Sequence, residues 1–184
     1  MALKTLIITT DGACSGNGQL EPAAGYAFSI EMEGSTHKSV QSGPIADEYP
    51  TNQRAEAYAL LEALRHIVGV CRGLKPNAVG THSTIDPKTL NLLVVTDSEW
   101  LIGAIWGGNK RNANTEILAE IDLQLAVFGS SEPFKVKGHP KPSQLRDQAF
   151  VAANPNVVRH NAVDKLAAAA AQKARETREL ETAG

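Results

Sequence analysis

The chain has 184 residues, of which 42% are apolar and 21% are charged, so it can bury a hydrophobic core of ordinary size. Its net charge of −2 excludes a global basic field, so any nucleic-acid contact must be local or helped by bound cations. Two cysteines, Cys14 and Cys71, are too few for a disulfide framework or a zinc site. No apolar run has the length of a signal peptide or a membrane span, so we expect a soluble, cytoplasmic protein without membrane contact.

The first part of the chain predicts three strands followed by a helix. Residues 6–10 (LIITT) are rich in β-branched side chains and end at an Asp-Gly turn. Residues 24–31 and 37–41 read as two further strands joined by a hairpin. From Thr51, which is a suitable N-cap, apolar residues recur at helical spacing and predict a helix that ends near Gly73.

The rest of the chain alternates predicted strands and helices between two long loops. Two prolines and two glycines predict the first loop, at 73–90. The second loop is expected at 140–158, with one helical turn inside it. The remaining predicted elements are a strand at 92–96, a helix capped by Asp97-Ser98, a helix at 115–127, a strand at 134–137 and an alanine-rich helix at 161–179. The polar end of the chain, about 173–184, is expected to project into solvent.

This order of elements predicts an α/β fold with a mixed sheet. Three strands in series form an antiparallel meander, and the later helix–strand units add parallel strands beside its first member. We expect one domain over residues 1–184.

Four acidic residues lie in unusual local sequence: Asp11, Glu56, Asp97 and Asp164. Each has a structural explanation when taken alone, because Asp closes turns and caps helices, and acids near a helix start favour its dipole. Asp11 and Asp97, however, both follow apolar strands, and ligands gather at the carboxyl ends of such strands. Acids that converge there would make a site for hard divalent cations, which take oxygen ligands.

The motifs around these acids resemble those of the type 1 ribonuclease H family. The matching stretches are TDGACSGNG (10–18), TNQRAE (51–56), VVTDSEW (94–100), VKGH (136–139) and NAVDKLA (161–167). The resemblance implies a five-stranded mixed sheet flanked by helices and an endoribonuclease that cuts the RNA strand of RNA–DNA hybrids. It also implies two-metal catalysis with Mg²⁺, for which Mn²⁺ can substitute, that leaves 5′-phosphate and 3′-hydroxyl ends.

The same resemblance assigns roles to individual residues. Asp11, Glu56, Asp97 and Asp164 would bind the two ions, with Asp11 bridging them. His139 matches a mobile histidine that assists proton transfer or product release, although a lone loop histidine is more often only exposed. The residues that would contact the hybrid are Gly12, Cys14, Asn17, Thr51, Asn52 and Gln53. The partner would be an RNA–DNA hybrid, bound by a monomer.

Two departures from the family pattern affect the expected affinity. The segment at 106–114 replaces a basic helix and loop and offers only Lys110 and Arg111 as cations, and Glu99 adds a negative charge beside Asp97. We therefore expect modest, strongly salt-dependent binding.

Other functions remain open from the sequence. One is a nuclease of the same fold that acts on DNA junctions or double-stranded RNA. Another is a non-catalytic module that binds hybrids. A metallophosphatase is disfavoured, because the sequence lacks histidine-rich ligand clusters.

Overall fold

The computed structural model describes residues 3–16, 22–48, 50–137 and 139–182 and contains a five-stranded mixed sheet. Its strand order is β3-β2-β1-β4-β5. The strands are β1 (Lys4–Ser15), β2 (Ala23–Met32), β3 (Lys38–Ile45), β4 (Leu90–Thr96) and β5 (Ser130–Lys135). β2 is antiparallel to β1 and β3, whereas β4 is parallel to β1 and β5. The predicted meander with added parallel strands is therefore confirmed.

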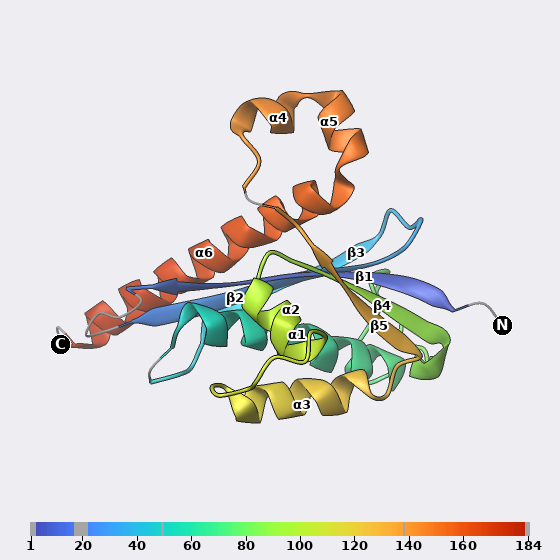
Figure 1. Cartoon of the computed structure of the whole chain (residues 1–184), viewed down its shortest axis with the longest axis horizontal. Coiled ribbons are helices and arrows are strands. Elements are labelled where there is room, and N and C mark those ends of the chain that lie inside the picture. The colour runs from blue at the N-terminus through green and yellow to red at the C-terminus, as the bar shows by residue number, and fades with distance from the viewer. Residues whose placement is uncertain (1–2, 17–21, 49, 138, 183–184) are drawn as a thin grey trace.

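Helices cover both faces of this sheet (Figure 1). They are α1 (Asn52–Cys71), α2 (Glu99–Ile105), α3 (Thr115–Leu125), α4 (Pro142–Arg146), α5 (Gln148–Ala153) and α6 (Pro155–Thr182), with a 3₁₀ turn at Pro87–Thr89. The helices α1, α2 and α3 lie on one face, and the long α6 crosses the other face over β1, β2 and β3. None of the helices in the described parts of the chain is long and apolar enough to span a bilayer.

The main core lies between the sheet and α1. Thr51 caps α1 as predicted, with its side chain accepting the Arg54 backbone N–H at 3.2 Å. Leu60, Leu64 and their helical neighbours pack against fully buried Ile8 and Phe28 of the sheet. Each such side chain contributes about 1.5–3 kcal/mol by burial, so this packing fixes where the start of α1 meets β1.

The opposite face of the sheet meets α6 through small residues. A Cβ at Gly25 of β2 would lie only 2.4 Å from the Ala171 backbone nitrogen and 2.6 Å from the Ala170 Cβ. Nearby Val163 and Ala167 of α6 pack on Ala27. The alanine-rich sequence thus allows α6 to approach the sheet closely.

The prediction of a long loop at 140–158 was wrong, because this segment contains α4, α5 and the start of α6. Two of its prolines, Pro142 and Pro155, stand at the first positions of α4 and α6. A proline is well tolerated there, since that backbone N–H has no helical partner. Asp147 starts α5 by accepting the Ala149 and Phe150 backbone N–H groups.

Two further boundaries differ from prediction. β5 spans Ser130–Lys135 rather than 134–137, because its sequence SSEPFK is largely polar and carries no alternation to mark an edge strand. The C-terminal turns of α6 are helical as predicted, but they do not simply project into solvent. Arg178 donates to the backbone oxygens of Pro22 and Asp47, both at 2.6 Å.

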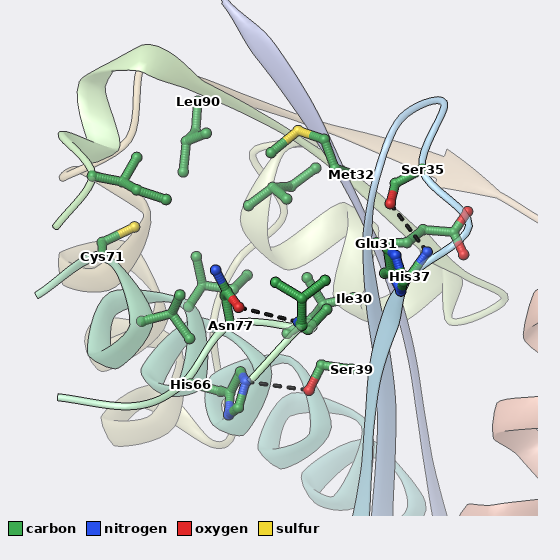
Figure 2. A pocket seen from close by; sticks show the side chains of 16 residues that line it. Ile30, Glu31, Met32, Ser35, His37, Ser39, His66, Cys71, Asn77 and Leu90 are labelled. Atoms are coloured by element: carbon green, nitrogen blue, oxygen red, sulfur yellow. Dashed lines mark hydrogen bonds between the residues drawn. The ribbon is translucent and has the colours of Figure 1, made fainter. Parts of the chain in front are cut away.

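The segment at 73–90 is largely irregular, as predicted, and it borders an apolar cavity of about 220 Å³ (Figure 2). Residues of β2, β3, α1 and the loop line this cavity, among them Ile30, His66 and Val79. His66 is buried there and satisfied, with Ser39 Oγ 3.3 Å from Nε2 and Gln41 Nε2 3.0 Å from Nδ1. None of the predicted site residues lines the cavity.

Candidate active site

The four predicted acids come from four elements that meet at one edge of the sheet. β1 pairs with β4 only from Lys4 to Thr9, so Asp11 lies just beyond this parallel ladder. Asp97 directly follows β4, at the same edge. Ser98 rather than Asp97 caps α2, with Oγ accepting the Leu101 backbone N–H at 3.3 Å. Helix capping therefore does not account for the Asp97 carboxylate.

Burial and neighbouring acids raise the pKa of two of these carboxyl groups, Asp11 and Glu56. Burial, followed by the charges of Asp97 and Asp164, raises the pKa of Asp11 to about 7, although His160 and the Gly12 backbone N–H oppose this rise. Burial and the charge of Asp11, with further contributions from Asp97 and Asp164, also raise the pKa of Glu56 well above its usual range. The four carboxyl groups are therefore close enough to repel one another, as expected of a site that awaits a cation.

His160 of α6 is the one functional candidate that the sequence reading missed. It is only 3% exposed, and its Nε2 lies 3.4 Å from Asp97 Oδ1 and 3.9 Å from Asp11 Oδ1. Burial disfavours protonation, but Asp97, Asp11 and Asp164 outweigh it and raise the pKa of His160, and His160 in turn lowers the pKa of Asp97. Its spacing from Asp164 could have indicated it. His160 precedes this candidate by four residues, and residues four apart lie on the same face of a helix.

The polar atoms of the site fit a metal ion. Within the described part of the chain, Glu56 Oε2 and His160 Nε2 are buried and have no hydrogen-bond partner. Donor atoms of Asp11, Asp97 and His160 all lie within 4.8 Å of one another. No Lys or Arg among the described residues forms an ion pair with the four acids, and only His139 and His160 do. Buried like charges of this kind are stabilised by a divalent cation.

His139 lies at the open side of this cluster. Its side chain is 67% exposed, and its Nδ1 lies 3.5 Å from Asp164 Oδ2. An exposed imidazole beside a site carboxylate can exchange protons with solvent.

The residues predicted to contact substrate gather where β1 meets α1, except for Asn17, which lies outside the described residues. Asn52 Oδ1 accepts the Cys14 backbone N–H at 3.0 Å, and Cys14 Sγ lies 3.4 Å from the Pro50 carbonyl oxygen. Thr51 and Gln53 are exposed beside Asn52 at the start of α1.

Gly12 differs from these residues because it is buried. A Cβ at this position would come within 2.1–2.3 Å of the Ala55 and Glu56 backbones. Its position allows the first turns of α1, and with them Glu56, to reach Asp11.

The two departures from the family pattern have structural partners. Glu99 forms an ion pair with Lys135 of β5, so its charge is partly offset. Arg111 pairs with Asp122 of α3 and donates to the Ala104 carbonyl at 2.8 Å. Arg111 therefore supports the fold of this segment, which weakens its value as a free phosphate contact.

Two curated proteins resemble this chain in sequence. The chain is 32% identical over 150 residues to the ribonuclease H of Syntrophomonas wolfei subsp. wolfei, a match that covers 74% of this chain and 86% of that protein. It is 28% identical over 144 residues to the ribonuclease H of Chlorobium phaeovibrioides, covering 74% of this chain and 81% of that protein.

Solved structures share the fold. The N-terminal RNase H domain of Mycobacterium tuberculosis Rv2228c superposes with a TM-score of 0.63 at 17% identity, over 95% of this chain and 99% of that one. The structure of LC11-RNase H1 in complex with an RNA/DNA hybrid superposes with a TM-score of 0.54 at 22% identity. The match covers 92% of this chain and 98% of that one. The RNase H family model matches residues 3–172. With that match across nearly its whole length and a ribonuclease H relative above 30% identity, the chain belongs to the RNase H family.

Proposed function

We propose that this protein is a metal-dependent endoribonuclease that hydrolyses the RNA strand of RNA–DNA hybrids. Membership of the RNase H family supports nuclease activity, and a fold neighbour bound to an RNA/DNA hybrid supports the choice of substrate. The observation that carries the proposal is the convergence of four carboxylates from β1, α1, β4 and α6 without a lysine or arginine counter-charge in the described structure. Carboxylate oxygens gathered in this way are the ligands that hard divalent cations take.

In this proposal Asp11, Glu56, Asp97 and Asp164 would hold two Mg²⁺ ions, with Asp11 as their shared ligand. When bound, such ions supply an activated water and neutralise the leaving 3′-oxygen in an in-line displacement. The carboxylates of Glu56 and Asp97 serve the side of the leaving group, and Asp164 serves the side of the attacking water. The products carry 5′-phosphate and 3′-hydroxyl ends.

His139 has a separate role at the solvent side of the site. Its imidazole, 3.5 Å from Asp164, accepts or delivers a proton near the water side and then exchanges it with bulk solvent. High exposure of the side chain leaves it free to turn between these two positions.

The junction of β1 and α1 recognises the hybrid. A nuclease of this specificity must sense the 2′-hydroxyl groups of one strand only. Backbone and side-chain groups of this junction face the minor groove in our proposal, and Thr51 holds a DNA phosphate. The remaining contacts come from Gly12, Cys14, Asn17, Asn52 and Gln53. The enzyme acts as a monomer and as one domain over 1–184, in the cytoplasm.

A substrate panel tests the proposal. Labelled RNA–DNA hybrid, single-stranded RNA, double-stranded RNA and duplex DNA are incubated with the protein in Mg²⁺, Mn²⁺ or EDTA, with Asp97→Asn as the matched inactive variant. We expect metal-dependent cutting of the hybrid's RNA strand alone, with end-group analysis giving 5′-phosphates. Cutting of double-stranded RNA or DNA would assign another substrate to the fold. Binding of hybrid with no cleavage in any metal would indicate a non-catalytic module.

A further inference from the structure

His160 sits inside the acid cluster rather than beside it. It is 3% exposed and lies one helical turn before Asp164 on α6, so both side chains face the same site. Its Nε2 is 3.4 Å from Asp97 Oδ1 and 3.9 Å from Asp11 Oδ1, so it forms ion pairs with both acids when protonated, although neither contact has the geometry of a hydrogen bond.

The two buried histidines of the described structure face different groups. His66, 5% exposed, has neutral partners at both ring nitrogens, Ser39 and Gln41. His160 Nε2 instead faces the carboxylates of Asp97 and Asp11. The nitrogen is thus placed as a ligand atom would be.

The separations suit one shared ion. Ligand atoms about 2.1 Å from a metal lie about 3 Å apart when adjacent and about 4.2 Å apart when opposite. The distances from His160 Nε2 to Asp97 and Asp11, 3.4 and 3.9 Å, fall within this interval. Glu56 Oε2, also buried without a partner, remains available to complete the oxygen ligands.

We propose that His160 coordinates, through Nε2, the metal ion held by Asp11 and Asp97, and that this nitrogen makes the site prefer Mn²⁺ over Mg²⁺. Imidazole suits Zn²⁺, Cu²⁺, Fe²⁺ and Ni²⁺, whereas carboxylates and water suit both Mg²⁺ and Mn²⁺. Of these two ions, Mn²⁺ is the transition metal and the one that also accepts an imidazole nitrogen beside oxygen ligands. The inference rests on the proposed function only in that these acids bind metal, and it needs no assumption about substrate or turnover.

Pulsed electron paramagnetic resonance of Mn²⁺ tests the ligand directly. The full-length protein is labelled with ¹⁵N-histidine, loaded with Mn²⁺, and compared with its His160→Asn, His139→Asn and His66→Asn variants. We expect ¹⁵N hyperfine coupling in the unmodified protein and in the His139 and His66 variants, and its loss in His160→Asn. No coupling in the unmodified protein, or loss of coupling in His139→Asn, would overturn the proposal. If His160→Asn does not fold, retention of the coupling in each of His37→Asn, His66→Asn, His82→Asn and His139→Asn leaves His160 as the ligand.

Metal affinities provide the second readout. Calorimetric titration without nucleic acid should show that His160→Asn weakens Mn²⁺ binding by at least about 10-fold and changes Mg²⁺ binding by less than about 3-fold, because Mg²⁺ gains little from imidazole. Equal losses for both ions would mean that His160 acts only as a counter-charge and would overturn the metal preference. A protein that keeps the coupling but cuts no hybrid would refute the proposed function and leave this inference intact.

Discussion

Removing the charge of Asp11 should stabilise the metal-free protein while destroying its activity. Burial and neighbouring acids raise the pKa of Asp11 from 3.8 to about 7 in the folded protein. At pH 8, ionised Asp11 therefore costs the folded state about 4 kcal/mol, since one pKa unit corresponds to about 1.4 kcal/mol. Asn has nearly the same size and carries no charge. We expect Asp11→Asn to raise the free energy of unfolding in EDTA at pH 8 by about 2–4 kcal/mol.

The stabilisation expected from Asp11→Asn should depend on pH. The pKa of Asp11 is higher in the folded protein than in the unfolded chain. The Asp11 carboxyl therefore favours the folded state below about pH 4 and loses this effect as the pH rises towards 7. At pH 5 the gain from Asp11→Asn should therefore shrink to about 2 kcal/mol or less. Mg²⁺ should stabilise the unmodified protein, by about 2.7 kcal/mol at 100 times its Kd, but not the variant.

Urea denaturation in EDTA and in Mg²⁺, at pH 5 and pH 8, measures all of these quantities. The exposed Glu132→Gln is the matched control for losing one carboxylate, and it should change stability by less than about 0.5 kcal/mol. If Asp11→Asn were no more stable than the unmodified protein at pH 8, or if its gain did not depend on pH, the acids would not repel one another as described.

Three further predictions concern residues around the site. Gly12→Ala should destabilise the protein by at least about 2 kcal/mol and abolish cleavage, because its Cβ would meet the Ala55 and Glu56 backbones at 2.1–2.3 Å; normal melting and turnover would contradict this. Glu99→Gln should free Lys135 to contact a phosphate, and this should steepen the slope of log K against log salt for hybrid binding by about one unit. Filter binding on an Asp11→Asn background measures this slope. An unchanged slope would exclude this role of Lys135. Leu60→Ala, in the fully buried core, should lower the free energy of unfolding by about 2–5 kcal/mol, measured by urea denaturation, with little change in metal affinity. A large loss of metal affinity would mean that the packing of the core also determines the geometry of the site.

The sequence predicted those parts of the fold in which local pattern and packing agree. The helix that begins after Thr51 has a cap and an apolar face, and its predicted boundaries are confirmed within a few residues. β5 was placed poorly because a polar edge strand is specified by its neighbour β4 and not by its own residues. The helices at 142–153 were not predicted, because proline, which ends many helices, can also begin one, as Pro142 and Pro155 do here.

The acids of the site could be found from sequence because each lies in a distinctive motif. His160 could not be found in this way, since NAVDKLA begins one residue after it and its contacts with Asp11 and Asp97 are entirely tertiary. In the same way, the pairing of Glu99 with Lys135 depends on how α2 sits over β5. The charge of Glu99, which appears unbalanced along the chain, finds its partner only in the folded molecule.

The close contact between Gly25 and α6 has a mechanical consequence for the site. α6 packs closely on Gly25 of the sheet at Ala170 and Ala171, and it carries His160 and Asp164 nearer its other end. At about 1.5 Å per residue, His160 lies about 16 Å along the helix from this contact. A tilt of only about 5° about the contact would displace His160 by about 1.4 Å. Metal ligands tolerate errors of about 0.5 Å. A small tilt of α6 is therefore amplified towards its other end, and a methyl group added at Gly25 would displace a residue of the proposed metal site without contacting that site.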